Sequence, residues 1–179
     1  MDKAFTIWFT GISGSGKSTL SNEIKDFLIK KGHKVQVLDG DVLRNDIGGM
    51  FGYTRNERCS AARVYRLLAR LLNENGIYVI VAAIAPYKEI RRINREKLNN
   101  YIEIYVNCPL EECIRRDVKG LYKKALNGEE KNVVGIDEPF EKPSNYDIQV
   151  NTKQETISVS SNRIKRFLDR RLGGEKDGE

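Results

Sequence analysis

The sequence predicts an α/β protein in which helices cover both faces of a mainly parallel β-sheet, in three layers. Short apolar stretches rich in β-branched residues alternate along the chain with longer segments that carry apolar residues at helical spacing. The run 77–84 is almost purely apolar, as expected of a central strand that is buried on both faces. These two patterns favour a sheet built from successive strand–helix–strand units.

The elements follow from the same patterns in chain order. Strands are predicted at 4–9, 34–38, 77–84, 101–107 and 147–151, and helices at 17–31, 56–75, 88–100, 110–117 and 156–172. Gly32 and Gly76 are expected to end the first two helices, and Asp39-Gly40-Asp41 is expected to form a turn after the second strand. Residues 117–143 are rich in Lys, Gly and Asn, so we expect either a lid over a site or a disordered insertion, too polar to join the core.

Length and composition limit the class of protein. The 179 residues, 40% hydrophobic and 31% charged, fit one globular domain at 1–172 with a flexible tail at 173–179. The longest apolar run is far shorter than the roughly 20 residues that span a bilayer. Three cysteines make no disulfide framework, and the start of the chain leaves no room for a signal peptide, so a cytoplasmic protein is expected. The net charge of +6 suits an anionic partner without identifying it.

A phosphate-binding loop follows the first predicted strand. Residues 11–18 read GISGSGKS, which fits G-x-x-x-x-G-K-[ST], and they open the first predicted helix. Backbone N–H groups of such a loop converge on phosphate oxygens, and the helix N-terminus adds partial positive charge. Lys17 would reach the β- and γ-phosphates, and the Ser18 hydroxyl would bind Mg²⁺. The residues predicted to bind the nucleoside triphosphate here are Gly11, Ser13, Gly14, Ser15, Gly16, Lys17, Ser18 and Thr19.

The remaining motifs indicate which kind of P-loop protein this is. The N-K-x-D motif of GTPases is absent, and the long apolar strand ends in Ala-Ala-Ile-Ala-Pro, without the carboxylate of motor-type ATPases. Acidic residues lie instead at Asp39 and Asp41, after the second strand. Because the carboxyl ends of parallel strands gather at one edge, both should face the P-loop. Two acids there can order the waters of Mg²⁺ and hold an acceptor hydroxyl, as a small-molecule kinase requires. The alternative is that these aspartates have no catalytic role and are present because an Asp-Gly pair suits the backbone geometry of a turn.

The chain resembles the adenylylsulfate kinases, which phosphorylate the 3′-hydroxyl of adenosine 5′-phosphosulfate. The matching segments include Trp-Phe-Thr-Gly at 8–11, Leu-Asp-Gly-Asp at 38–41 and Lys-Gly-Leu-Tyr-Lys-Lys-Ala at 119–125. The resemblance implies a P-loop kinase fold with a lid, ATP and Mg²⁺ as cofactors, and in-line attack on the γ-phosphorus.

The resemblance also implies roles for single residues. Catalytic residues would be Lys17, Asp39 and Asp41, with Asp41 orienting or deprotonating the hydroxyl. Ser18 and Asp39 would hold the metal, and Arg116 would contact ATP. Arg44, Arg58 and Arg63 would bind the acceptor, and Lys119 and Lys123 would place positive charge near the transferred phosphoryl group. The other residues expected at the acceptor are Tyr53, Ile84, Pro86, Gly120, Leu121 and Val133.

Departures from the family pattern concentrate on the acceptor side. The family sandwiches the adenine between two phenylalanines, and Tyr53 and Val133 stand at those positions here. Two asparagines near the acceptor are replaced by Val42 and Ala61, and the serine that some relatives phosphorylate is also lost. The sequence therefore favours a different acceptor with a smaller base, such as cytidine diphosphoramidate. Adenylylsulfate stays an open alternative, because Tyr53 can stack on a purine and Val133 can pack against it.

Functions other than that of a small-molecule kinase are less favoured by the sequence. The basic stretches 88–97 and 163–171 suggest a nucleic-acid-binding module, but they lack interleaved aromatic residues and are expected to be solvated helix faces. A catalytically inactive nucleotide sensor is disfavoured because Lys17, Ser18 and Asp41 are all present. The expected partner is a small nucleotide, with no nucleic acid and no membrane. A homodimer is compatible with the resemblance and is neither supported nor excluded by the sequence.

Overall fold

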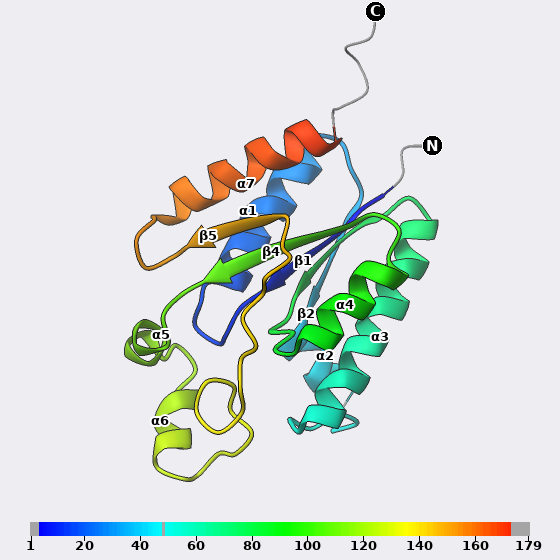
Figure 1. Cartoon of the computed structure of the whole chain (residues 1–179). Helices are drawn as coiled ribbons and strands as arrows, with labels where there is room; N and C mark the ends of the chain where they lie inside the picture. The colour runs from blue at the N-terminus through cyan, green and yellow to red at the C-terminus, as the bar shows by residue number, and fades with distance from the viewer. Residues whose placement is uncertain (1–3, 48, 173–179) are drawn as a thin grey trace, which may run out of the picture.

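The computed structural model describes residues 4–47 and 49–172, and the tail predicted at 173–179 lies outside them (Figure 1). The strands are β1 (Thr6–Thr10), β2 (Val35–Asp39), β3 (Tyr78–Ala82), β4 (Tyr101–Asn107) and β5 (Ile148–Asn151). The helices are α1 (Lys17–Lys30), α2 (Gly40–Asp46), α3 (Arg55–Glu74), α4 (Lys88–Lys97), α5 (Leu110–Arg116), α6 (Leu121–Leu126) and α7 (Ile157–Leu172).

The five strands form one parallel sheet in the order β2-β3-β1-β4-β5. The central strand β1 is fully buried and pairs Thr6 with Val79 on one side and with Tyr101 on the other. All carboxyl ends of the strands therefore lie at the same edge, where the loops that follow them can share a site. The predicted parallel sheet is confirmed.

Helices cover both faces of the sheet, as the three-layer prediction requires (Figure 1). Ile7 and Phe9 of β1 join the cluster beneath α1 and α7, whereas Trp8 between them joins the cluster beneath α3 and α4. The alternation follows from the two-residue period of a strand, which sends successive side chains to opposite faces. Among the described residues, no helix is both long and apolar enough to cross a membrane.

The predicted turn at residues 39–41 was wrong, because the chain passes directly from β2 into α2. Asp39 is the N-cap of α2, and its carboxylate accepts hydrogen bonds from the backbone N–H groups of Asp41 at 2.9 Å and Val42 at 3.5 Å. An aspartate that satisfies these free N–H groups favours a helix start as readily as a turn. The Asp-Gly pair therefore begins a helix.

The expectation that residues 117–143 are too polar for core was also wrong. This stretch, called here the 117–143 segment, contains α6 and contributes Tyr122, Ala125, Val133 and Val134 to a third buried cluster. Those side chains pack against Ile12 of the P-loop and against Cys108 and Cys113. The buried apolar residues of this segment are few and stand among many Lys, Asn and Glu residues. Their spacing therefore gives no hydrophobic periodicity that would have predicted their burial.

Candidate active site

The P-loop joins β1 to α1 at the carboxyl edge of the sheet. Gly14 and Gly16 have φ values of +74° and +100°, in the left-handed region that favours glycine. A Cβ on Gly11 would lie 2.5 Å from the backbone oxygen of Val106, so this position tolerates no side chain. The motif glycines are thus required by the backbone path that aims the loop's N–H groups into the site.

Lys17 is the first residue of α1, and its Nζ donates to the carbonyl of Ile12 at 2.8 Å. Desolvation and, next, the nearby positive charge of Lys119 lower the pKa of Lys17 to about 8, while Asp41 acts in the opposite direction. The ammonium group is therefore held in place, with few solvent contacts, at the start of the helix. An anionic phosphate that came within reach would reverse the shift in its pKa.

Ser18 and Asp39 meet although β1 and β2 are separated in the sheet by β3. The Ser18 hydroxyl donates to Asp39 Oδ2 at 3.0 Å. A hydroxyl and a carboxylate are oxygen ligands of the kind that Mg²⁺ takes, usually together with phosphate oxygens and waters. Within the described ranges no group of three or more His, Cys, Asp or Glu side chains could hold a metal alone. The pair therefore fits a metal that arrives with a triphosphate.

A cavity of about 390 Å³ lies beside the P-loop. Arg116 lines it and ties the end of β5 to the P-loop: its Nη2 donates to the Thr152 carbonyl at 2.6 Å and its Nη1 to the Gly14 carbonyl at 3.3 Å. The Thr152 hydroxyl donates in turn to the Ser15 carbonyl at 2.8 Å. The other lining residues include Ser13, Gly16, Ser18, Thr19, Asp117, Lys119, Tyr122 and Glu155. A volume of this size lies in the range of small-molecule sites.

A second, smaller cavity of about 80 Å³ adjoins the first and shares Lys17 and Ile84 with it. Asp41 lines the smaller cavity, and Lys119 lines the larger. The two side chains form an exposed ion pair, Lys119 Nζ with Asp41 Oδ2, which bridges the two cavities. A hydroxyl held at Asp41 would therefore face a phosphate held at Lys17.

Tyr53 lies under two guanidinium groups at the mouth of the smaller cavity. Arg44 and Arg58 place their Cζ atoms 4.7 and 5.3 Å from the centre of its ring. Arg44 also donates to the carbonyls of Phe51 and Gly52, while Arg58 donates to those of Tyr53 at 2.8 Å and Asn132 at 2.7 Å. Two cations and an aromatic face are suited to a ligand that carries both an anionic group and a base.

The rest of the wall is apolar. Ile84 and Pro86, which were predicted to lie at the acceptor, both line the smaller cavity. The other apolar residues that line it are Trp8, Ala61, Ala62, Tyr65, Ala82, Ala83, Ala85 and Ile90. Small side chains at 82, 83 and 85 leave the backbone of this stretch close to the cavity.

Several predicted acceptor residues are not at this cavity. Arg63 is exposed on α3, and Lys123 is exposed on α6; neither lines either cavity. Val133 is 4% exposed and packs in the third cluster, as does the partly buried Leu121. Gly120, with φ of +65°, is the N-cap of α6. In this structure Val133 therefore forms no face of a base pocket.

Two residues at the site were missed in the sequence. Thr152 follows β5 and bonds to the P-loop, as described above, while the Tyr122 hydroxyl donates to the Ser13 carbonyl at 2.9 Å. Thr152 could have been found, because it follows a predicted parallel strand at the edge where the other site residues lie. The sequence carried no comparable signal for Tyr122.

Comparisons with known proteins agree with this geometry. The family model described as adenylylsulphate kinase matches residues 3–151. An adenylyl-sulfate kinase of Picosynechococcus sp. is 41% identical over 166 residues, covering 93% of this chain and 94% of the relative. A probable adenylyl-sulfate kinase of Aeropyrum pernix is 44% identical over 161 residues, covering 88% of each. The chain belongs to the adenylylsulfate kinase family.

A solved member of the family has the same fold. The APS kinase CysC of Mycobacterium tuberculosis, in complex with AMPPNP and APS, has a TM-score of 0.89 and 34% identity, covering 94% of this chain and 99% of that one. Membership of the family makes this chain an ATP-dependent phosphotransferase with a hydroxyl acceptor, and ATP with Mg²⁺ is its phosphoryl donor.

Proposed function

We propose that the chain transfers the γ-phosphoryl group of ATP to the 3′-hydroxyl of adenylylsulfate. The observation that carries this proposal is the pair of adjoining cavities that share Lys17, one beside the P-loop and the other lined by Asp41, Arg44 and Tyr53. The relatives described above are named adenylyl-sulfate kinases, and the structure from M. tuberculosis contains an ATP analogue and APS.

The sequence favoured a different acceptor, and the pyrimidine nucleotide that it suggested has no support among these relatives. The aromatic position at Tyr53 is kept, under two arginines. The valine at position 133 lies in the core, so its replacement of an aromatic residue is no evidence for a smaller base. Adenylylsulfate is therefore the acceptor that we propose.

In this proposal each half of the site has a distinct task. Mg²⁺-ATP, when bound in the larger cavity, supplies the phosphoryl group and charge neutralisation by the metal. Lys17 and Lys119 stabilise negative charge on the transferred group, while Arg44 and Arg58 hold the phosphosulfate of the acceptor. Asp41 accepts a hydrogen bond from the acceptor hydroxyl at its Oδ1, which has no partner among the described side chains. The 117–143 segment, which carries Lys119, acts as the lid.

A direct comparison of acceptors tests the proposal. ADP release would be measured with Mg²⁺-ATP and either adenylylsulfate or cytidine diphosphoramidate, and the phosphorylated position would be assigned by ³¹P NMR. We expect kcat/KM to be at least about tenfold higher with adenylylsulfate, which corresponds to about 1.4 kcal/mol of discrimination. A higher value with the cytidine compound would overturn the assignment of the acceptor and leave the ATP-dependent kinase activity intact.

The role of Asp41 has its own test in the variant Asp41→Asn. If the carboxylate removes the proton, kcat falls by about 10²–10⁴-fold, because an amide cannot accept a proton at neutral pH. If Asp41 only orients the hydroxyl, the amide oxygen still accepts the hydrogen bond and kcat falls less than about tenfold. We expect the larger loss, with the KM for ATP within a factor of two. Asp46→Asn, at the far end of α2, is the matched control.

A further inference from the structure

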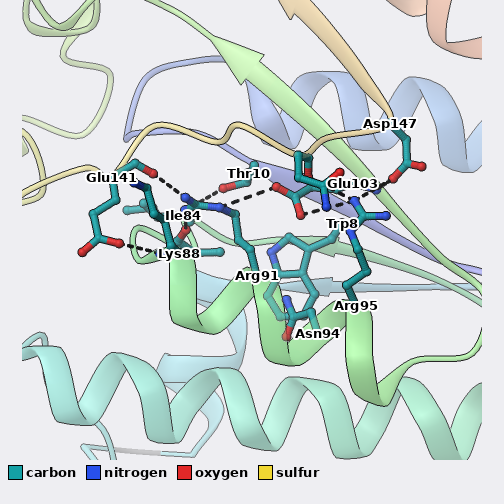
Figure 2. A network of polar contacts seen from close by, with 12 residues as sticks. Trp8, Thr10, Ile84, Lys88, Arg91, Asn94, Arg95, Glu103, Glu141 and Asp147 are labelled. Carbon is teal, nitrogen blue, oxygen red and sulfur yellow. Dashed lines mark hydrogen bonds and ion pairs between the residues drawn. The ribbon is translucent and has the colours of Figure 1, made fainter.

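Arg91 of α4 joins three parts of the molecule that are distant in the sequence (Figure 2). Its Nη1 donates to the carbonyl of Ala85 at 2.6 Å, its Nη2 donates to the carbonyl of Glu141, and its Nε lies 3.6 Å from Glu103 Oε1. Arg91 is 5% exposed and Glu103 is 1% exposed. Buried ion pairs are often no more stabilising than apolar side chains of the same size, so stability alone does not account for this arrangement.

The first contact of Arg91 is with the wall of the smaller cavity. Ala85 has φ of +45°, which an L-residue with a Cβ rarely adopts. Its carbonyl direction is fixed by Arg91, and the neighbouring carbonyl of Ile84 accepts a hydrogen bond from the Thr10 hydroxyl at 2.6 Å. Figure 2 shows Arg91 reaching toward this stretch from α4. The unusual backbone of the wall is therefore held by side chains from two other elements.

The second contact of Arg91 is with the end of the 117–143 segment. Glu141 donates its backbone N–H to the Pro86 carbonyl at 2.9 Å, and its Oε2 accepts from the backbone N–H of Lys88 at 2.6 Å. That carboxylate caps α4, whose N-cap residue Tyr87 supplies no side-chain cap of its own. The Tyr87 hydroxyl donates to Glu138 Oε2 at 2.8 Å. The segment thus returns to the sheet directly against the cavity wall.

The third contact holds the guanidinium group itself. Glu103 on β4 faces Arg91 and also Arg95, whose Nη2 lies 3.8 Å from Glu103 Oε2 and 3.0 Å from Asp147 Oδ2. The Tyr101 hydroxyl donates to Glu103 Oε2 at 3.2 Å. Glu103 therefore places a buried negative charge beside the Arg91 guanidinium group, in an ion pair in which Oε1 accepts no hydrogen bond from the described residues.

We propose that Arg91 is a positioning residue for the acceptor nucleotide. It does not line the smaller cavity, but it fixes the Ala85 carbonyl and the Glu141 carbonyl with one guanidinium group. The shape of the acceptor wall is thereby coupled to the anchorage of the 117–143 segment. The proposal rests on the proposed function only for the identity of the acceptor.

The kinetic test compares Arg91→Met with Arg92→Met, the next residue on α4, which is exposed and pairs with Glu96. For Arg91→Met we expect the KM for adenylylsulfate to rise about tenfold or more, because the smaller cavity loses the charge-assisted hydrogen bonds that hold its wall. The KM for ATP should stay within about twofold, because Arg91 does not line the larger cavity. Arg91→Lys should be intermediate, because a single ammonium nitrogen cannot reach the Ala85 and Glu141 carbonyls together, which Arg91 meets through two separate nitrogens. Equal changes in both KM values, or none in that for adenylylsulfate, would overturn the proposal.

A second measurement is independent of the acceptor. Hydrogen–deuterium exchange of the Lys88 and Glu141 amides should accelerate together in Arg91→Met and stay unchanged in Arg92→Met. Unchanged exchange at Glu141 would overturn the coupling, even if the wild type proved inactive with adenylylsulfate. That inactivity would by itself count against the proposed function and leave the coupling to be decided by exchange.

If Arg91→Met does not fold, the double variant Arg91→Met/Glu103→Gln replaces it, because this variant also removes the buried carboxylate that has lost one of its two arginine partners. Glu103→Gln alone is then the reference protein. The same split between the two KM values is expected relative to that reference, and its absence would overturn the proposal.

Discussion

The two cavities of the active site are built in different ways. The larger one is formed around a loop whose path is fixed by glycines and by hydrogen bonds that the side chains of Thr152 and Arg116 donate to its carbonyls. The smaller one is formed mainly by residues of α2, α3 and the stretch after β3, and its volume of about 80 Å³ is well below the roughly 300 Å³ of a typical ligand site. In the proposed function the ATP side is therefore preorganised, whereas the acceptor side would widen to admit a nucleotide.

The arginines of the acceptor side explain what opening involves. The guanidinium groups of Arg44 and Arg58 donate to backbone carbonyls at 51, 52, 53 and 132. An entering phosphosulfate would replace those carbonyls as the acceptor of the hydrogen bonds. Burial lowers the pKa of Arg58, as does the nearby charge of Arg44, so an anion between them relieves an existing repulsion.

The largest expected effect is on the preorganised side. Lys17→Met should lower kcat by about 10²–10³-fold, because the site loses a positioned charge on the transferred phosphoryl group. Because Lys17 also lines the smaller cavity, the dissociation constant of adenylylsulfate, measured by calorimetry without ATP, should rise as well, by less than about tenfold. Lys30→Met, in the last turn of α1, is the control. An unchanged kcat in Lys17→Met would contradict the role assigned to this charge.

A smaller effect is expected on the acceptor side at Tyr53. Stacking on one base face is worth about 1–3 kcal/mol, so Tyr53→Ala should raise the KM for adenylylsulfate by about 5- to 150-fold. Tyr53→Phe keeps the ring and should match the wild type within about twofold. The KM for ATP should be unchanged in both variants. Equal values for Tyr53→Ala and the wild type would show that the ring does not contact the base.

The next effect is on stability and not on catalysis. Val133→Phe restores an aromatic residue but overpacks the third cluster, which costs about 1–3 kcal/mol and should lower Tm by roughly 2–10 °C. Steady-state kinetics should give both KM values within about twofold of the wild type. Val159→Phe, at an exposed position of α7, is the control. A lower KM for adenylylsulfate in Val133→Phe would instead place position 133 at the acceptor.

The smallest effect concerns protons. Lys17 has a pKa of about 8 in the free protein, and the negative triphosphate should raise it. ATP binding therefore takes up a fraction of a proton above pH 8, and affinity for ATP falls as pH rises through that value. Calorimetry at pH 8.5 in two buffers of different ionisation enthalpy measures this uptake, and identical heats would contradict it. Lys119→Met removes a charge that lowers the pKa of Lys17. In this variant the proton uptake on ATP binding should therefore begin at a higher pH than in the wild type.

Sequence reasoning was most effective where function depends on the backbone. Residues 11–18 could be assigned because their glycines are required by the local backbone conformation. The contact between Asp39 and Ser18 could be expected because parallel strands end at one common edge of the sheet. The structure of α2 and α6 was missed, since Asp-Gly serves turns and helix starts alike and the anchors of α6 are sparse. The orientation of Val133 depends in part on packing in one cluster with Ile12, Cys108 and Cys113, which are at least twenty positions away and which no local pattern connects to it.

The division of the lining residues has a consequence for how such an enzyme can change over time. Among the described residues, only Lys17 and Ile84 line both cavities. If each cavity binds one substrate, as proposed, a substitution at most other lining positions, the bridging pair Asp41 and Lys119 aside, alters the site of one substrate only. The two halves can accumulate substitutions at separate rates, and a lineage could explore new acceptors while its donor chemistry stays under unbroken selection.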